Sequence, residues 1–592
     1  MKPICKTLTL IITLITLLVP ARAETLPDWL FDPTPAAEAA TPAPTPGIPD
    51  ADLEDDGLLR VWLKSLNDPE ALHLTLAGSY ALEGSGGFYF HRDAQIALAA
   101  ADGDIWLTAG GLTVNLGPAA TLTRHATEGD APNGLYIDES EKHALYCGDL
   151  SVYVTASGRL RAILEIPVEE YLLGVVAYEM SDSFPIEALK AQAVAARTYA
   201  MQRKWAAGQR RYHLVDTTAD QVYKGYDPEY AAVAEAVAAT RGVVCTYKGG
   251  FATCYYTASN GGQTALPSQI WGSEDDEGYL AMTDDPYDTE NPYSLENDLS
   301  FTAECQGSAK LKSMLEAALA KIMPDEGYDD WTLDSIAAIE PAEPRFPGSR
   351  IYDALAFDLN VKVPESALAT PSPVPSETPG ATPADLPPEP EKWARLDETQ
   401  RVTLEVFDDI KEGLSMGLNG TDCELISVET QSDESGTATA FRLVMRRYGH
   451  GVGMSQRGAQ QMAGEHGMDY MEILNFYYPG VSVQRMTWPD MTLQPLQSLP
   501  VDVTAARPRP TPVPTPAPLP ALKPGERYAR VAASSLNVRE RPTTASRVVD
   551  VLDQGQRVIV SGEPDAEGWV SMHTAELEGF VKLEYLDPAA AA

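Results

Sequence analysis

Short stretches of alternating apolar and polar residues dominate the first third of the chain, and they predict β-strands. Between Leu58 and Leu164, segments such as RVWLKSL, IWLTAG and LSVYVTASG are separated by Gly, Asn and Asp residues. An alternation with a period of two places the apolar side chains on one face of a strand, and the turn-forming residues mark the strand ends. We therefore expect a β-rich region over residues 58–164.

From about residue 170 onward, apolar residues recur every three or four positions, a spacing that predicts helices. The strongest pattern predicts a helix over Ser183–Trp205, with Ser183 as its N-cap and Pro185 near its first turn. Its inward stripe would consist of Ile186, Leu189, Ala193, Ala196 and Ala200. Further helices are predicted over Tyr171–Ala177, Tyr230–Thr240, Ser308–Ile322, Gln456–His466 and Tyr470–Tyr477, and a strand is predicted over Ile351–Val361.

Proline-rich tracts divide the 592 residues, which are too many for a single core. The tracts at 24–56 and 486–525 predict linkers, and the tract at 364–393 predicts a disordered insertion, because segments of this composition cannot bury a core. We expect one α+β domain over 57–485 that the insertion interrupts without splitting it in two. A small all-β module is expected over 526–587.

The first residues have the pattern of a secretory signal peptide. Met1–Lys6 is basic, Leu8–Val19 is apolar, and Ala21-Arg22-Ala23 forms a small-residue cleavage site. We expect cleavage after Ala23 and an exported protein, either extracellular or associated with the wall or membrane; an uncleaved signal anchor is the alternative and would be the link to a membrane. The formal net charge of -41 argues against a nucleic acid as partner, because an acidic chain does not neutralise phosphates.

Two of the cysteines predict a disulfide. Cys245 and Cys254 are placed symmetrically about Gly249-Gly250 in VVCTYKGGFATCYY. If the two glycines form a hairpin turn, the cysteines lie opposite each other with Cα atoms about 4.5 Å apart, near the geometry of a disulfide. An exported protein permits oxidation. The alternative interpretation is a pair of small buried apolar residues.

Two long motifs resemble those of one family of bacterial cell-wall proteins. They are EYLLGVVAYEMSDSFPIEALKAQAVAARTYA at 170–200 and the glycine-dense GHGVGMSQRGAQQMA at 449–463. Together they resemble the SpoIID/LytB family, and the segments LEIPVEEYL, DQVYKGY, ASNGGQT, IWG and GYL support the resemblance. It implies a mixed domain in which helices flank a groove.

The C-terminal module resembles a bacterial SH3-like domain. The resemblance rests on LNVRERP, the DQG turn, Trp569 and GFVKLEYL. Such domains commonly bind peptidoglycan; a spacer or a partner-binding module is the alternative.

The family resemblance implies a lytic transglycosylase that cleaves the MurNAc–GlcNAc bond of peptide-stripped peptidoglycan, with its glutamate falling on Glu179. Most glycosidases need two carboxylates, whereas lytic cleavage can use one. An apolar setting made by Val175, Val176, Tyr178 and Met180 would raise the pKa of this acid. The alternative is that Glu179 forms a structural ion pair with Lys190 or Arg197.

Other residues are candidates for contact with the glycan. Lys190 and Arg197 could bind sugar oxygens, or could form structural ion pairs. Amides suit sugar hydroxyls and aromatic faces suit sugar rings, although each such residue could equally pack in a core. The candidates of this kind are Gln192, Gln221, Tyr223, Trp271, His450 and Gln456.

No metal or other cofactor is expected. Some relatives bind zinc around the DQVY segment, but here Ala219 and Asp220 stand where a cysteine would precede QVY. The sequence thus predicts a lytic transglycosylase whose partner is the glycan strand, in wall remodelling or sporulation. The alternative function is a non-catalytic modifier of a cell-wall amidase, for which the groove would hold the glycan or the amidase.

Overall fold

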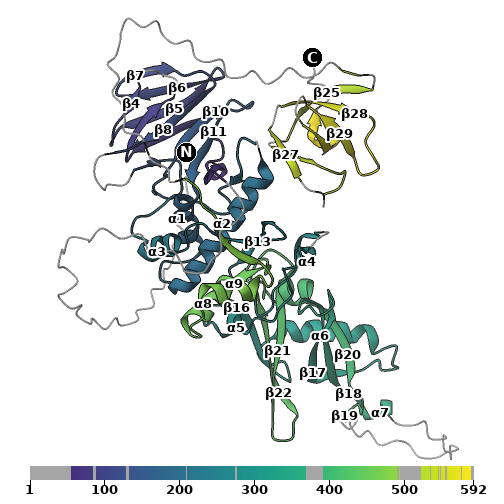
Figure 1. Ribbon diagram of the computed structural model, residues 1–592. Helices are drawn as coiled ribbons and strands as arrows, with labels where there is room; N and C mark the ends of the chain where they lie inside the picture. Colours follow the sequence, from purple (N-terminus) through teal and green to yellow (C-terminus); the bar gives the residue numbers. More distant parts are fainter. Residues whose placement is uncertain are drawn as a thin grey trace, which may run out of the picture. The chain divides into compact units, whose positions relative to one another are not determined.

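The computed structural model describes most of the chain from residue 55 onward (Figure 1). The described residues are 55–83, 88–127, 133–208, 210–273, 276–368, 391–489, 493, 522–523, 525–533, 535–544, 546, 548–553, 556–574 and 577–587. The predicted signal peptide, residues 369–390 of the predicted insertion and the prolines of the second linker from Pro495 onward lie outside these residues. At its edges the prediction of a disordered insertion over 364–393 is wrong, because Pro364 ends a strand, Glu365–Leu368 forms the short helix α7 and Trp393 begins a strand. Among the helices that are described, none combines the length and the hydrophobicity needed to span a bilayer.

Two sheets form the N-terminal part, as the alternating pattern predicts. One has the strand order β12-β1-β11-β10-β8-β3-β4 and the other β7-β6-β5-β2-β9. The first consists of β1 (Leu58–Trp62), β3 (Ser79–Leu82), β4 (Tyr89–Phe90), β8 (Ala119–His125), β10 (Asp149–Val154), β11 (Leu160–Pro167) and β12 (Leu214–Val215). The second consists of β2 (Ala71–Leu76), β5 (Gln95–Ala101), β6 (Asp104–Ala109), β7 (Leu112–Asn115) and β9 (Leu135–Ile137). The apolar face of each sheet belongs to the same hydrophobic core.

Helices α1 (Val168–Glu179), α2 (Ile186–Ala207) and α3 (Ala231–Ala239) complete this core together with the sheets. Helix α1 begins earlier than predicted, so Glu169 and Glu170 lie in its first turn instead of a preceding loop. Helix α2 begins later, with Pro185 at the N-cap position and without a side-chain cap. The prediction that Ser183 caps α2 is therefore wrong, because its hydroxyl pairs with that of Ser181.

The small sheet β14-β13-β24 lies beside α2 and carries the first of the two cysteines. Its strands are β13 (Val243–Tyr247), β14 (Gly250–Phe251) and β24 (Ser482–Arg485). The hairpin turns at Lys248-Gly249, where both residues have positive φ angles of 50° and 82°, as a type I′ turn requires.

The predicted hairpin register is therefore wrong, and Cys245 lies opposite Ala252, whose N–H donates to the Cys245 carbonyl. Cys254 is then the diagonal neighbour of Cys245, on the same face of the hairpin. The two thiols are within hydrogen-bond distance of each other, and burial raises the pKa of the Cys254 thiol. Both are free thiols in this structure.

A second hydrophobic core forms between residues 301 and 445, inside the range that the sequence predicts as one domain. The sheet β16-β22-β21 consists of β16 (Glu296–Thr302), β22 (Ala438–Arg446) and β21 (Leu425–Ser432). In the other sheet, β18 (Tyr352–Pro364) pairs with β17 (Thr332–Pro344), β19 (Trp393–Arg395) and β20 (Gln400–Glu405). Helix α6 (Ala309–Ile322), which Ser308 caps, and the π-helix Val406–Gly413 add apolar side chains to this core.

Short elements connect the two cores and form the surroundings of the candidate site. They are β15 (Tyr256–Thr257), α4 (Pro267–Trp271), α5 (Pro286–Glu290), β23 (Met454–Ser455), α8 (Gln456–Gly464) and α9 (Tyr470–Tyr477). Helix α9 has the predicted bounds, and α8 ends two residues before the predicted His466.

The C-terminal module is all β in its described residues and has its own core. Its strand order is β27-β26-β30-β29-β28-β25-β31. The strands are β25 (Glu526–Val531), β26 (Ser535–Arg539), β27 (Val548–Asp553), β28 (Arg557–Ser561), β29 (Trp569–His573), β30 (Glu578–Lys582) and β31 (Leu586–Asp587).

We predict that Cys245 and Cys254 become linked when the protein is exported into an oxidising environment, because their thiols are already in contact. Alkylation of the unfolded, unreduced protein followed by peptide mass spectrometry should detect one cross-linked peptide pair. Cys147, Cys305 and Cys423 should be alkylated and serve as internal controls. Alkylation of both Cys245 and Cys254 without reduction would contradict the prediction.

Candidate functional site

Glu179 is the last residue of α1, and its carboxyl group is half-buried. Val175, Val176 and Met180 are buried around the end of the helix, as the sequence predicts, whereas Tyr178 is exposed and lies under the ammonium group of Lys142. The C-terminal end of a helix carries partial negative charge, which disfavours a carboxylate. The position of Glu179 thus favours a protonated acid.

Two hydrogen bonds from distant segments hold the carboxyl group of Glu179. The side-chain amide of Gln456 donates to Oε2 over 3.1 Å, and the two residues are 277 positions apart in the sequence. The backbone of Val222, within the DQVYKGY segment, forms the second hydrogen bond. The two long motifs recognised in the sequence therefore meet at this carboxyl group.

The pKa of Glu179 is raised to about 7 from an ordinary value of 4.5. Burial is the largest cause and raises the pKa, while the hydrogen bonds from Gln456 and Val222 stabilise the carboxylate and lower it. In the part of the chain that the structure describes, no ion pair is formed by Glu179. The alternative of an ion pair with Lys190 or Arg197 is therefore not what the structure shows.

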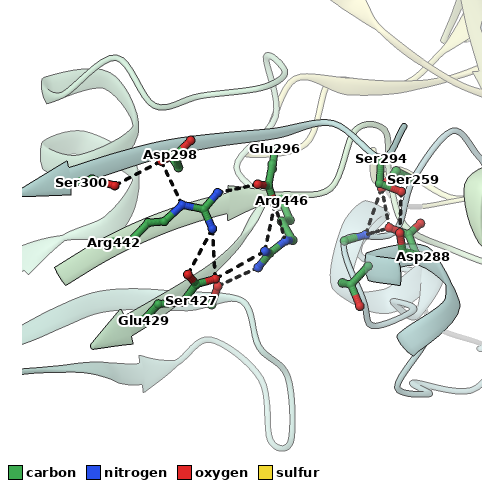
Figure 2. Close-up of polar contacts among 12 residues, drawn as sticks. Ser259, Asp288, Ser294, Glu296, Asp298, Ser300, Ser427, Glu429, Arg442 and Arg446 are labelled. Atoms are coloured by element: carbon green, nitrogen blue, oxygen red, sulfur yellow. Dashed lines mark hydrogen bonds and ion pairs between the residues drawn. The ribbon is translucent and has the colours of Figure 1, made fainter. Parts of the chain in front are cut away.

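Gln456 reaches Glu179 because a buried polar network fixes the start of α8. The Ser455 hydroxyl accepts a hydrogen bond from Gly458 N and caps the helix, and it donates to the carboxylate of Asp288. Asp288 is fully buried and also accepts hydrogen bonds from the Ser259 hydroxyl and the backbone of Asn260 (Figure 2). Strand β15 pairs in parallel with β23, which aligns Thr257 with Ser455.

Arg447 joins the glycine-dense loop to the ASNGGQT segment. Its buried guanidinium donates to the carbonyl oxygens of Asn260, Gln263 and Cys423 at 2.7–3.0 Å. A Cβ at Gly451 would lie 2.6 Å from this guanidinium, and the φ of 74° at Gly451 also favours glycine.

The strand that leads into Arg447 is held by a network of ion pairs on the β16-β22-β21 sheet. Arg442 on β22 pairs with Glu296 and Asp298 on one neighbouring strand and with Glu429 on the other (Figure 2). Arg446 pairs with Glu296 and Glu429 as well. The glycine-dense loop thus starts from a strand that ion pairs connect to both of its neighbouring strands.

An aromatic group joins helix α4 to the glycine-dense loop. The ring of Trp271 is 4.9 Å from that of Tyr255 and 5.0 Å from that of His450, and Trp271 is 47% exposed. Tyr256, which follows Tyr255 in the chain, is close enough to Glu179 for the two side chains to interact electrostatically. Trp271 therefore offers an exposed aromatic face of the kind that binds sugar rings.

His450 is a neutral member of this group. Its Nδ1 accepts a hydrogen bond from Val452 N over 3.0 Å, and its ring also hydrogen-bonds with the backbone of Tyr256. Burial is the main reason that its pKa is lowered to about 4. The imidazole thus positions the Trp271 ring and the loop, and it carries no charge near neutral pH.

Several predicted glycan contacts are instead buried structural groups. Arg197 is fully buried and forms a bidentate pair with Glu169, at 2.7 and 3.0 Å, so it has no access to a ligand. Gln221 is buried and hydrogen-bonded to Tyr171, Tyr256 and the Ala196 carbonyl. Arg197 thus forms the structural ion pair, and Gln221 has the buried position, that the sequence offered as alternatives to glycan binding.

The remaining candidates are not among the hydrogen-bond partners of the Glu179 carboxyl group. Lys190 pairs with Glu187 over 2.7 Å. Tyr223 is buried against the rings of Tyr146 and Tyr171. Gln192 is fully buried, and its amide atoms have no hydrogen-bond partner among the described residues. The structure therefore brings Gln456 to Glu179 and Trp271 and His450 to the neighbouring aromatic group.

Sequence reasoning missed the groups that hold the site together. These are Asp288, Arg447, Ser455, Tyr255 and Tyr256. Ser455 carried a usable signal, because a serine directly before a predicted helix is a preferred N-cap. Asp288 carried none, since it is one of many acidic residues in its part of the sequence and no pattern distinguishes it from them. As for metals, the described residues contain no group of three or more His, Cys, Asp or Glu side chains placed to hold an ion.

Comparison with known proteins agrees with the family resemblance. Residues 156–247 match the family model SpoIID, described as stage II sporulation protein, and residues 534–587 match the bacterial SH3 domain. The chain therefore contains a SpoIID-family domain and a bacterial SH3 domain, and both resemblances predicted from the motifs are confirmed.

Three relatives are similar over parts of the chain. The amidase enhancer of Bacillus subtilis (strain 168) is 28% identical over 327 residues, which is 53% of this chain and 40% of the relative. An uncharacterized protein of Brachyspira hyodysenteriae is 38% identical over 128 residues, 22% of this chain and 34% of the relative. Stage II sporulation protein D of Bacillus subtilis is 28% identical over 349 residues, 56% of this chain and 78% of the relative. The chain thus spans less than half the length of the first two.

We predict that Glu179→Gln stabilises the protein at alkaline pH. A raised pKa means that the charged form is disfavoured in the folded state, so wild type should be destabilised as pH rises from 4.5 toward about 7. The variant mimics the protonated acid; it should match wild type at pH 4.5 and be more stable at pH 8 by about 1–3 kcal/mol.

Unfolding transitions recorded at both pH values would test this expectation. Glu235→Gln, at an exposed position on α3, is the matched control and should shift the unfolding midpoint equally at both pH values. A pH-independent effect of Glu179→Gln would show that Glu179 titrates normally.

Proposed function

We propose that this protein is an exported lytic transglycosylase of peptidoglycan, acting in wall remodelling or sporulation, with Glu179 as its single acid and base. The observation that carries the proposal is the raised pKa of Glu179, about 7, in a half-buried carboxyl group without an ion-pair partner among the described residues. An acid of this kind is half protonated near neutral pH and is ready to donate its proton.

The proposed reaction consumes no water. Glu179 donates its proton to the glycosidic oxygen of the MurNAc–GlcNAc linkage, and the bond from C1 of MurNAc to that oxygen breaks. The C6 hydroxyl oxygen of the same MurNAc attacks C1, and the Glu179 carboxylate takes the hydroxyl proton. One new end is a GlcNAc 4-hydroxyl, the other is 1,6-anhydro-MurNAc, and the acid is regenerated.

The surroundings of Glu179 support chemistry with one carboxyl group. Hydrolytic glycosidases commonly place a second carboxylate about 5–9 Å away, as nucleophile or base. The causes of the Glu179 pKa shift are burial and two hydrogen bonds, and no neighbouring carboxylate is among them. The amide of Gln456 can hold the carboxylate in place between the two proton transfers.

The comparisons support a role at the cell wall. Relatives are named stage II sporulation protein D and amidase enhancer, and the bacterial SH3 domain would hold the enzyme at peptidoglycan. The amidase enhancer favours a second candidate function, in which the chain binds glycan and modifies a wall amidase without cleaving the strand. Both functions place the protein outside the cytoplasm.

We predict that residues 24–592 release anhydro-MurNAc ends from purified, peptide-stripped glycan strands, and that Glu179→Gln abolishes this release. The amide can neither donate nor accept the required proton, so the rate should fall at least a hundredfold. Mass spectrometry of the products is the measurement, and Glu235→Gln is the control that should retain activity. If wild type binds glycan without cleaving it, the amidase-modifier function replaces this proposal.

We predict that kcat/KM for strand cleavage falls as pH rises above about 7, because the free enzyme must begin with Glu179 protonated. In Gln456→Ala the midpoint of this decrease should move to higher pH, since a hydrogen bond that lowers the pKa of Glu179 is lost. Rates measured between pH 5 and 9 would test both statements. A midpoint that does not respond to Gln456→Ala would assign the decrease to another group.

A further inference from the structure

Arg457 is a half-buried cation that directly follows Gln456, and among the described residues no carboxylate forms an ion pair with it. It follows Gln456 on α8, and its Nη1 donates to Oε1 of Gln460 over 2.8 Å. The guanidinium has no ion pair with any residue that the structure describes. Because a guanidinium carries five N–H donors, most of its hydrogen-bonding capacity remains for a ligand.

Two aromatic rings form a shelf with this cation. The guanidinium carbon lies 5.3 Å from the ring centre of Phe184 and 5.7 Å from that of Tyr293. Phe184 belongs to the short loop that follows Glu179, and Tyr293 is 66% exposed. The Asn291 side chain donates to the Arg457 carbonyl over 2.8 Å and fixes the segment that carries Tyr293. Two members of the Phe184–Tyr293–Arg457 shelf are close in sequence to groups of the site, because Arg457 directly follows Gln456 and Phe184 lies in the loop after Glu179.

The position of Arg457 is unfavourable for the isolated protein. It is the second residue of α8, at the helix end where the backbone N–H groups carry partial positive charge and disfavour a cation. Burial also lowers the pKa of Arg457, with desolvation as the largest cause. An anion bound at this position would offset both the burial of the guanidinium and its repulsion by the helix end, because its negative charge would interact favourably with each.

The chemistry of the shelf fits an acidic sugar. Aromatic faces bind sugar rings, and guanidinium groups bind carboxylates in a planar, bidentate manner. In peptidoglycan the lactyl group of MurNAc ends in a free carboxylate only where the stem peptide has been removed; otherwise the carbonyl is an uncharged amide. With a net charge of -41 the chain repels polyanions in general, so a local cation is needed to admit one.

We propose that Arg457, on its shelf with Phe184 and Tyr293, binds the lactyl carboxylate of a MurNAc residue next to the one that is cleaved, and thereby selects strands without stem peptides. This inference rests on the proposed function, because it assigns the substrate selectivity of the same site. Arg457 is on this view a specificity residue and takes no part in proton transfer.

The test measures binding without cleavage, so that it does not depend on the role of Glu179. Residues 24–592 with Glu179→Gln are the parent, and fluorescently labelled peptide-stripped strands are the ligand. Adding Arg457→Gln should weaken binding about tenfold at low salt, a loss that shrinks as salt screens the charge. Arg457→Lys should lose less, because it keeps the charge but not the bidentate geometry. Lys310→Gln, which removes an exposed cation from α6, should change nothing.

A second ligand separates charge recognition from general damage to the site. Strands whose carboxylates have been converted to methylamides should bind the parent and Arg457→Gln equally. The inference is overturned if Arg457→Gln binds native strands as tightly as the parent, if it loses equal affinity for the methylamide strands, or if the parent binds neither. Carboxylate-dependent binding together with inactive wild type would refute the proposed function and leave the assignment of Arg457 intact.

Discussion

The carboxylate of Asp288 is the interaction on which the site depends. It is fully buried, and it accepts hydrogen bonds from Ser259, Asn260 and Ser455, so its charge is stabilised where water is absent. Removal of one partner from a buried charge commonly destabilises a protein by several kcal/mol. The start of α8 is therefore held rigidly, and Gln456 is presented to Glu179 in one orientation. A carboxyl group whose pKa depends on burial requires this kind of support.

The buried arginines show how charge is distributed around that acid. Arg197 is neutralised by Glu169, and Arg124 by Glu170, so both glutamates of the first turn of α1 serve the fold. Glu179, at the other end of the same helix, has no such partner in the described chain. One helix thus carries two acids at the end where negative charge is favoured and one at the end where it is disfavoured. This asymmetry separates the carboxyl groups that are paired with arginines from the one whose pKa is raised.

The sequence allowed the strand-rich start, most helices and the pair of distant motifs to be predicted, because periodicity and motif length depend on the chain itself. It did not reveal which partner each buried group would select. Arg197 was weighed as a partner of Glu179 and is instead bound to Glu169, since helical spacing defines a face but not the residue that meets it. The hairpin of Cys245 turns one residue early because Lys248 accepts a positive φ, a choice that two adjacent glycines concealed. The sequence did not reveal a second core, because the alternating pattern of a strand does not show with which other strands it packs.

The separation of 277 positions between Glu179 and Gln456 has a consequence for the order in which the protein matures. Helix α1 emerges early during synthesis, whereas Gln456 is made only after most of the second core. Contacts between such distant residues form late in folding, because they require the closure of a very long loop. The acid consequently lacks its partner until the chain between them has folded. A nascent or truncated chain would present an incomplete site, so the time of assembly determines when the Glu179 carboxyl group acquires its native surroundings.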